Sequence, residues 1–433
     1  MEEYIDKCLL SNKKIWINSK VFKTGLMINL TVLITIFKFW VLIIKIEYSD
    51  RVGRLPKYIF AAIEELKAKK KKEGIDLIPL GIGDPDLTTP DLIVNELIKQ
   101  VKIPDNQNYP SSMGEEDYRE AVARWHKVRY GLDLDPATEV SHVMGGKEGV
   151  ANIARAFINP GDIVLCPNPG YPVYANGATK LCDGEPYLMS LKKENNFLPD
   201  LEVIPTKTLK KAKMMYLNYP NNPTGAIAPK EYLKKAADYA EDYKFFIVYD
   251  NPYSEFTYGD YIAPTILQVS QDHVEINSSS KMFNMTGFRC GWISGNAEII
   301  AGIRKIKSQI DSGGSIFVQK AVIKGLNEYT SEKKPEIVSK SMKIYEERRD
   351  VLVDGLNELG WKTDTPKATF YIWTSIPKGE ENSMEFVKKL INVGVVITPG
   401  IGFGEYGEGF VRFALTQPIP RIEEALDRIQ MVL

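Results

Sequence analysis

The sequence has few cysteines and histidines, and neither sign of charge is in excess. It contains four cysteines and three histidines in 433 residues, with a formal net charge of −1 at pH 7. Cys8, Cys166, Cys182 and Cys290 follow neither the spacing of a zinc site nor that of a disulfide framework. The near-zero charge gives no overall attraction to nucleic acid or to an anionic membrane. We therefore expect a cytoplasmic protein without a metal site and without a nucleic-acid partner.

Long apolar runs are also scarce, with one exception near the N-terminus. Residues 26–46 are apolar enough and long enough to span a bilayer, but Lys38 stands near their middle. A lysine there costs about 2.5–3.5 kcal/mol on insertion. Three interpretations stay open: a membrane tether, an arm that packs on a partner, and an upstream stretch outside the working protein. We favour the last over membrane contact, and we expect residues 1–49 to be dispensable for the chemistry.

After residue 50 the chain alternates short apolar strands with helices, and its length favours more than one domain. Between about residues 138 and 300 this alternation predicts a largely parallel α/β sheet with right-handed crossovers. Past about residue 330 a long charged helix and several short strands predict a smaller α+β unit. We expect an N-terminal extension (1–49), an N-terminal part of the small domain (50–80), a large domain (81–330) and a C-terminal small domain (331–433).

Lys281 ends the run Ser278-Ser279-Ser280-Lys281, just past a strand-like stretch. A primary amine in such a place can form a Schiff base with an aldehyde. The neighbouring hydroxyls and Arg289 can hold a phosphate. Taken alone, a serine-rich stretch before a lysine is usually a solvated loop. An amine that can form a Schiff base, next to groups that can hold a phosphate, points to pyridoxal phosphate.

Other strand ends carry groups that suit the same cofactor. Gly146 and Lys147 open a helix directly after a strand, where free amide groups and the helix dipole favour a phosphate. Asp250 closes an apolar run of the kind found in buried parallel strands, whose carboxyl ends gather ligands. Tyr171 follows another strand and could stack on a flat ring. The glycine pair Gly145-Gly146 is weak evidence when taken alone, and the plainer alternatives are a helix cap for Asp250, surface packing for Tyr171 and, at Gly83, an ordinary turn.

The order of these motifs resembles that of the class I and II aminotransferases, the fold-type I pyridoxal-phosphate enzymes. The motifs are Asn222-Pro223-Thr224-Gly225, Asp250 with Tyr253, Ser278 to Lys281, Arg289 and Arg412. The resemblance runs from about Tyr58 to the end of the chain. It implies a large domain with a mostly parallel seven-stranded sheet flanked by helices, a smaller α+β domain, and a homodimer that acts on amino acids and 2-oxo acids.

The resemblance also implies roles for single residues. Lys281 binds the cofactor and moves the proton, Asp250 keeps the pyridine nitrogen protonated, and Tyr253 reaches the ring 3-oxygen. The other implied cofactor contacts are Gly146, Lys147, Tyr171, Asn222, Ser278, Ser280, Arg289 and, across a dimer interface, Tyr109. The implied substrate contacts are Tyr58, Gly83, Lys147, Tyr171, Asn222 and Arg412, the last as the clamp on the α-carboxylate.

Three stretches are most similar to the LL-diaminopimelate aminotransferases: Gly145 to Gly149, Gly402 to Arg412, and the neighbourhood of Tyr58. Pro85-Asp86 departs from that pattern and looks like aspartate and alanine aminotransferases. We expect LL-diaminopimelate and 2-oxoglutarate as substrates in lysine biosynthesis, with an aspartate- or alanine-type enzyme as the main alternative. A carbon–sulfur lyase or a non-catalytic binding module are remote alternatives; residues 1–50 show no basic helix-turn-helix pattern that the second would need.

Overall fold

The computed structural model describes residues 47–55 and 61–433, with the backbone alone at residues 61 and 62. The chain divides into two compact units, residues 1–49 and 50–433, and the second is described below. The apolar segment 26–46 and Tyr58 lie outside the described residues. Within the described ranges, no helix combines the length and the apolar character that crossing a membrane requires.

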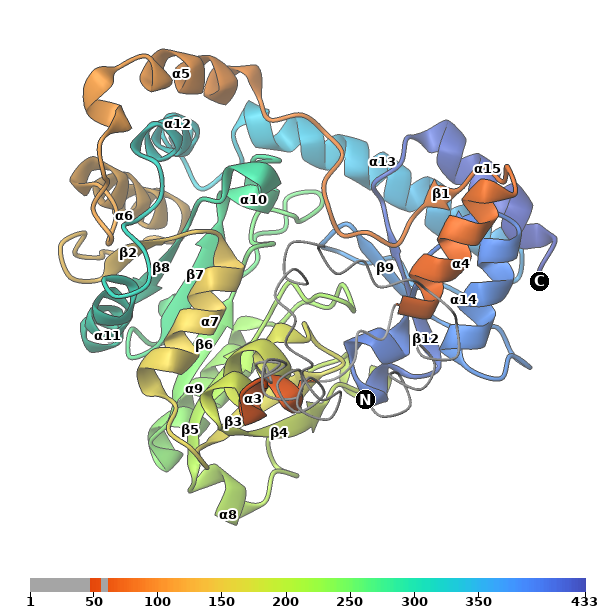
Figure 1. Cartoon of the computed structure of the whole chain (residues 1–433), viewed down its shortest axis with the longest axis horizontal. Helices are drawn as coiled ribbons and strands as arrows, with labels where there is room; N and C mark the ends of the chain where they lie inside the picture. The colour runs from red at the N-terminus through yellow and green to blue at the C-terminus, as the bar shows by residue number, and fades with distance from the viewer. Residues whose placement is uncertain (1–46, 56–60) are drawn as a thin grey trace, which may run out of the picture. The chain divides into compact units, whose positions relative to one another are not determined.

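A seven-stranded sheet organises the second unit (Figure 1). In spatial order its strands are β2 (Val140–Val143), β8 (Gly291–Gly295), β7 (Val274–Ser278), β6 (Phe246–Asp250), β5 (Ala212–Leu217), β3 (Ile163–Asn168) and β4 (Glu185–Ser190). Strand β8 runs antiparallel to both of its neighbours, and every other pair in the sheet is parallel. The expected mostly parallel seven-stranded sheet is therefore confirmed, and the carboxyl ends of its parallel strands share one edge.

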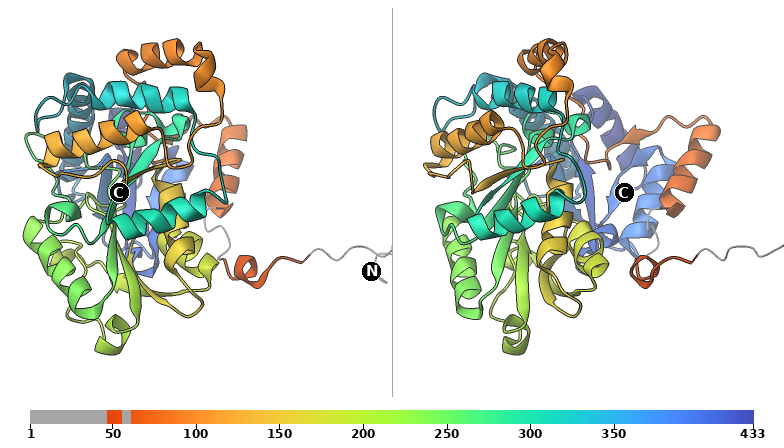
Figure 2. Two further views of the ribbon diagram at one scale, coloured as in Figure 1. Left: turned by 90° about the vertical axis from the view of Figure 1, so that its left-hand side faces the viewer. Right: turned by 60° about the vertical axis from the view of Figure 1, so that its left-hand side comes forward.

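Helices cover both faces of this sheet (Figure 2). Because side chains alternate along a strand, Met214 and Tyr216 of β5 join one apolar core, whereas Met215 and Leu217 join the other. The first core is closed by α7 (Gly146–Phe157) and α11 (Ala297–Lys307), and the second includes α9 (Lys230–Tyr243). The helices of this part are α3 (Asp50–Gly53), α5 (Asp91–Val101), α6 (Glu116–Tyr130), α7 (Gly146–Phe157), α8 (Thr206–Leu209), α9 (Lys230–Tyr243), α10 (Ser279–Met282), α11 (Ala297–Lys307) and α12 (Ile316–Leu326).

A three-stranded antiparallel sheet follows in the C-terminal part, in the order β11 (Thr398–Pro399), β12 (Phe410–Ala414), β9 (Tyr371–Ser375). Its helices are α13 (Glu336–Glu358), α14 (Ser383–Asn392) and α15 (Ile419–Gln430). Helix α4 (Ala61–Lys72) packs against α14, and β1 (Ile78–Pro79) pairs with β10 (Val395–Val396), so early and late parts of the chain lie side by side (Figure 1). The predicted domain boundaries within residues 50–433 stay predictions.

One predicted helix cap and one predicted helix start differ from the structure. The sequence Thr88-Thr89-Pro90-Asp91 predicts a threonine cap, but Pro90 precedes the first helical residue of α5 and no side chain caps it. The buried hydroxyl of Thr89 instead donates to the carbonyl oxygen of Asn284 at 2.9 Å, because a tertiary partner satisfies it. The long charged helix past residue 330 is expected from the sequence to begin at Lys333, but α13 begins at Glu336, because Pro335 stands in extended backbone before it.

Candidate active site

A cavity of about 650 Å³ lies at the carboxyl ends of the parallel strands. Tyr109 does not line it and is 90% exposed, and Tyr58 lies outside the described residues. All the other residues predicted for the site line this cavity: Gly83, Gly146, Lys147, Tyr171, Asn222, Asp250, Tyr253, Ser278, Ser280, Lys281, Arg289 and Arg412. The structure thus brings together residues that are up to 329 positions apart in the sequence.

Lys281 lies in the short helix α10, immediately after strand β7. Its Nζ donates to the carbonyl oxygen of Gly83 at 2.7 Å. Burial lowers the pKa of the Lys281 amine to about 8; Asp84 opposes this change, whereas Arg412 and Arg289 add to it. A sizeable neutral fraction near neutral pH lets this amine act as a nucleophile and as a base.

Asp250 is the last residue of β6 and is 5% exposed. Its Oδ2 accepts a hydrogen bond from the Tyr174 hydroxyl at 2.6 Å, whereas its Oδ1 has no partner within the described part of the chain. Burial raises the pKa of Asp250 to about 6, and the hydrogen bond from Tyr174 acts in the opposite direction. A buried carboxylate oxygen without a partner suits a protonated ring nitrogen.

The start of α7 forms an anion cradle together with α10 and Arg289. Gly145 precedes the helix with φ 78°, and a Cβ at this residue would come within 2.5 Å of Arg289 Nη2. Arg289 is held by the carbonyl oxygens of Thr286 at 2.7 Å and Met144 at 3.1 Å. The Ser278 hydroxyl caps α10 by accepting from the amide of Ser280. Free amides, hydroxyls and a guanidinium around one point match the needs of a phosphate.

Arg412 extends from β12 into the opposite side of the cavity. It donates through Nη1 to Asn222 Oδ1 at 2.7 Å and through Nη2 to the carbonyl oxygen of Gly81 at 2.8 Å. The central carbon of its guanidinium lies over the ring of Tyr371, 4.1 Å from the ring centroid, and over the ring of Phe403, at 4.6 Å. Such a flat, fixed fork is suited to bidentate binding of a carboxylate.

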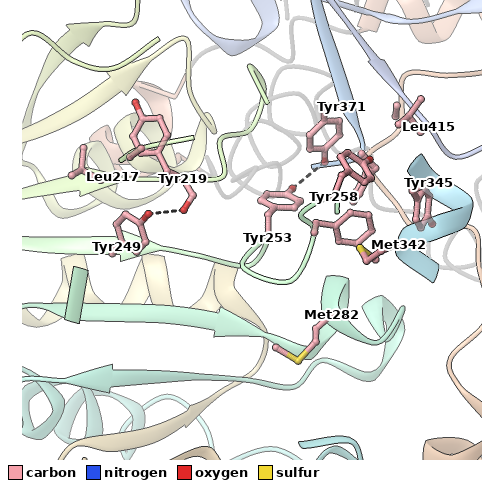
Figure 3. Packing of buried hydrophobic residues seen from close by; sticks show 14 of the residues in the cluster. Leu217, Tyr219, Tyr249, Tyr253, Tyr258, Met282, Met342, Tyr345, Tyr371 and Leu415 are labelled. Carbon is pink, nitrogen blue, oxygen red and sulfur yellow. Dashed lines mark hydrogen bonds between the residues drawn. The ribbon is translucent and has the colours of Figure 1, made fainter. Parts of the chain in front are cut away.

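Several cavity residues were not anticipated from the sequence: Tyr174, Tyr371, Phe403, Asn218 and Gly81. Tyr174 touches Asp250 from the π-helix Val173–Thr179, and its position three residues after Tyr171 is the one local signal that could have revealed it. Tyr371 is buried in the core pattern of β9, which gives no hint that its hydroxyl lies 3.0 Å from that of Tyr253 (Figure 3).

These features fit pyridoxal phosphate residue by residue. The cavity offers an amine of lowered pKa, a phosphate cradle, an unpartnered buried carboxylate oxygen and Tyr171 beside it. On a mostly parallel sheet with this strand order, such a set defines a fold-type I pyridoxal-phosphate enzyme.

The chain belongs to the class I and II aminotransferases, whose family model matches residues 75–429. It is therefore a pyridoxal-phosphate-dependent aminotransferase that acts on amino acids and 2-oxo acids.

The chain is also similar to individual known proteins. The chain is 47% identical over 385 residues to the LL-diaminopimelate aminotransferase of Desulforudis audaxviator, a match that covers 88% of this chain and 97% of the relative. Among solved structures it is similar to substrate-bound BacF from Bacillus subtilis, with a TM-score of 0.84, 35% identity and coverage of 89% and 98%. The aspartate aminotransferase of Thermus thermophilus with maleate matches with a TM-score of 0.83, 27% identity and coverage of 90% and 100%.

Proposed function

We propose that this enzyme transfers the amino group of LL-diaminopimelate to 2-oxoglutarate in lysine biosynthesis. The observation that carries the proposal is the 47% identity to an LL-diaminopimelate aminotransferase over 97% of that relative's length. The alternative of an aspartate-type enzyme rests on Pro85-Asp86 and on the match at 27% identity. Asp86, however, does not line the cavity and pairs with Arg348, so this residue carries no information about the substrate.

The distal end of the proposed substrate is itself an amino acid, with an ammonium and a carboxylate. The cavity is also lined by Glu64 and Lys67 of α4, which pair with each other at 2.9 Å, and by the exposed Lys147. These charges of both signs support a substrate that carries charges of both signs far from its reacting carbon. Aspartate and alanine have no second amino-acid group to place at such positions.

Pyridoxal phosphate supplies an aldehyde for the amino group and a cationic ring that accepts the electron pair of the broken Cα–H bond. In our proposal the Asp250 carboxylate holds the proton on the ring nitrogen, and Asn222 and Tyr253 bind the ring 3-oxygen. Gly146, Lys147, Ser278, Ser280 and Arg289 hold the phosphate, and Tyr171 covers the ring.

Lys281 acts as the proton carrier in this proposal. Its amine takes the proton from the substrate Cα and delivers it to the C4′ carbon of the cofactor. The lowered pKa of about 8 supports this role, because the amine then accepts a proton near neutral pH without holding it too tightly. Arg412 orients the substrate through its α-carboxylate, and the backbone at Gly83 closes over it.

A half-reaction screen tests the substrate. The purified enzyme, loaded with pyridoxal phosphate, is mixed in turn with LL-diaminopimelate, glutamate, aspartate and alanine, and the loss of cofactor absorbance is followed. We expect LL-diaminopimelate and glutamate to react at least about tenfold faster than aspartate and alanine. Fast reaction with aspartate and none with LL-diaminopimelate would replace the proposal with the aspartate-type alternative. No reaction with any of the four would leave neither substrate assignment standing.

We also propose a homodimer in which Tyr109 reaches the phosphate of the partner's site. Tyr109 is 90% exposed, and exposed apolar residues precede it: Ile98, Val101 and Ile103. An exposed apolar strip beside an unpaired tyrosine supports a protein interface here.

Mixing two inactive variants tests this arrangement. Chains with Lys281→Ala lack the amine, and chains with Tyr109→Ala lack the contributed hydroxyl. In a mixed dimer one site receives Lys281 from one chain and Tyr109 from the other, so activity should return in about a quarter of all sites after random exchange. If Tyr109 serves its own chain, mixing restores nothing.

The cytoplasm is the location that we propose. Cys166, Cys182 and Cys290 carry free thiols, which suits a reducing compartment. Fractionation of cells that produce the untagged protein tests this proposal, and recovery with the membrane fraction would contradict it.

A further inference from the structure

Tyr371 connects the two sheets at the cavity. It is the first residue of β9 in the three-stranded sheet, whereas Tyr253 follows β6 of the seven-stranded sheet. The two hydroxyl oxygens are 3.0 Å apart, and Figure 3 shows them directed at each other. Tyr371 is 2% exposed and Tyr253 is 5% exposed, so this hydrogen bond is largely shielded from water.

The backbone before Tyr371 is fixed by tertiary contacts. Thr369 has φ 65°, a left-handed conformation that a β-branched residue rarely adopts. The Thr369 amide donates to the Phe256 carbonyl oxygen at 2.7 Å, and its own carbonyl oxygen accepts from the Tyr258 hydroxyl at 2.6 Å. The Thr369 hydroxyl in turn accepts from the amide of Tyr371 at 3.1 Å. These bonds hold the Tyr371 ring in one place.

From that place Tyr371 touches two further parts of the site. The centroid of its ring lies 4.1 Å from the central carbon of the Arg412 guanidinium, a cation–π contact that Arg412 makes in addition to the one with Phe403. Its hydroxyl lies against the backbone of Gly83, where an added Cβ would stand 2.2 Å from the oxygen. One side chain therefore borders a proposed cofactor contact, the proposed carboxylate clamp and the loop over the cavity.

The direction of the hydroxyl–hydroxyl bond follows from what each group has to do. Tyr253 can donate its single proton to one acceptor. If that proton goes to the ring oxygen of the cofactor, the Tyr253 oxygen is left to accept from Tyr371. The Tyr371 hydroxyl makes no hydrogen bond to any other residue that the structure describes, so it is free to donate in this direction. Hydrogen bonds in such a chain strengthen one another.

We propose that Tyr371 is a positioning residue: its hydroxyl directs the Tyr253 hydroxyl toward the ring oxygen of the cofactor, and its ring holds the Arg412 guanidinium for the substrate carboxylate. This inference rests on the proposed role of Tyr253 at the ring oxygen. The two functions reside in different atoms of one side chain, so they can be separated by substitution.

Tyr371→Phe removes the hydroxyl and keeps the ring. A hydrogen bond donated to the ring oxygen reduces the negative charge on that oxygen. The oxygen then attracts the proton on the adjacent Schiff-base nitrogen less strongly. Loss of the hydroxyl should therefore move the midpoint of the pH titration of the cofactor absorbance upward, by roughly 0.2–0.5 unit. The KM for the amino donor should stay within about twofold, because the contact with Arg412 persists.

Tyr371→Leu removes the ring as well. We expect the same upward shift of the titration midpoint and, in addition, a rise in KM of roughly fivefold. If Tyr371→Leu fails to fold, two measurements on Tyr371→Phe still test the role of the Tyr371 hydroxyl. One is the pH titration, and the other is the affinity of the Tyr371→Phe apoenzyme for added pyridoxal phosphate. A weaker affinity is expected, because Tyr253 then holds the ring oxygen less well.

Two reference variants separate the possible failures. Tyr219→Phe removes a buried hydroxyl that donates to the Phe197 carbonyl oxygen at 2.6 Å and does not line the cavity, so its midpoint should not move. Tyr253→Phe should shift the midpoint more than Tyr371→Phe, and the double variant should match Tyr253→Phe alone. A shift in Tyr253→Phe with none in Tyr371→Phe overturns the inference and leaves the role of Tyr253 standing. No shift in either variant overturns both, and equal shifts in Tyr219→Phe and Tyr371→Phe overturn the specific role of Tyr371.

Discussion

Single residues in this site act through charge that is held in a fixed geometry, and Arg412 is the clearest case. Its guanidinium makes cation–π contacts with two aromatic rings and donates hydrogen bonds to Asn222 and to the backbone of Gly81. Burial lowers the pKa of Arg412, but an arginine remains charged at any working pH. The residue therefore offers a permanent, oriented cation to a carboxylate.

Arg412→Lys keeps the charge and removes the fork. We expect the KM for every amino donor to rise roughly 10- to 100-fold, with a smaller change in kcat, because two parallel hydrogen bonds become one. Steady-state kinetics with LL-diaminopimelate and glutamate measure this effect. Arg304→Lys serves as the control, since Arg304 donates to the carbonyl oxygens of Ala137 and Val140 and does not line the cavity. An unchanged KM in Arg412→Lys would exclude Arg412 as the clamp.

A second single residue, Glu275, affects the folding stability of the protein. It is fully buried in β7, and its Oε1 accepts from Asn251 at 3.0 Å and from Asn277 at 2.8 Å. Asn251 adjoins Asp250, and Asn277 adjoins Ser278, so this carboxyl group ties together the ends of two site-bearing strands. Burial raises the pKa of Glu275 from 4.5 to about 7, while the two asparagines oppose the change.

The sign of the pH effect follows from this raised pKa. Between about pH 4.5 and 7 the unfolded chain loses the proton of Glu275 while the folded chain keeps it, so folding stability falls as pH rises through this window and stays lower above it. Glu275→Gln removes this dependence. We expect the variant to gain roughly 1–3 kcal/mol relative to the native protein between pH 5 and pH 8. Thermal unfolding of both proteins at the two pH values measures the gain, and a difference independent of pH would refute it.

Among elements, the loop over the cavity depends on helix α13. Arg348 of α13 pairs with both oxygens of Asp86, at 2.7 and 3.0 Å, and also donates to the Leu415 carbonyl oxygen at 3.0 Å. Tyr345, one turn earlier on α13, donates to Asp86 at 3.1 Å. This docking holds the preceding loop, whose carbonyl oxygens at Gly81 and Gly83 contact Arg412 and Lys281.

Asp86→Asn weakens the contact between this loop and helix α13. Loss of the charge leaves Arg348, which is 6% exposed, without its counterion, and we expect a cost of roughly 1–3 kcal/mol in stability. The KM for the amino donor should rise as the loop loosens. Lys340→Ala is the matched control, because Lys340 pairs with Glu336 on the same helix but both are largely exposed. Equal effects of the two substitutions on KM would show that the docking does not govern the loop.

At the scale of the whole molecule, the first elements of the unit 50–433 pack against its C-terminal elements. Strand β1 pairs with β10, helix α4 packs against α14, and both Gly81 and Gly83 meet residues of the site. The segment from α4 onward is thus required for the cavity.

Removal of residues 1–46 should leave kcat and KM within about twofold of the full chain, since no cavity residue that the structure describes is lost. Steady-state kinetics on the two purified proteins measure this. Removal through Lys72 is the contrasting deletion, because it takes away Ile63, Glu64 and Lys67 of the cavity wall, and activity should be lost. A tenfold loss on the short deletion would assign residues 1–46 a part in the chemistry. Sedimentation with lipid vesicles, compared between the full chain and the short deletion, tests the membrane-tether interpretation.

The class of fold, and a set of residues that line the cavity, could be predicted from the sequence alone. Lys281, Asp250, Asn222 and Arg289 stand at strand ends or in short motifs, and the order of these motifs along the chain is visible without any coordinates. The alternation of strands and helices was also readable, because the period of apolar residues depends on local geometry.

The hydrogen bonds that hold these groups could not be predicted from the sequence, because they join residues far apart along the chain. Tyr174 and Asp250 are 76 residues apart, Tyr253 and Tyr371 are 118 apart, and Gly81 and Arg412 are 331 apart. A hydrogen bond depends on the distance and direction between two atoms, and for such pairs both are set by the tertiary packing of the elements that carry them. No local pattern distinguishes Tyr371, which borders Tyr253 and Arg412, from an ordinary core tyrosine. The same reason explains why Thr89 bonds to Asn284 and leaves its helix uncapped.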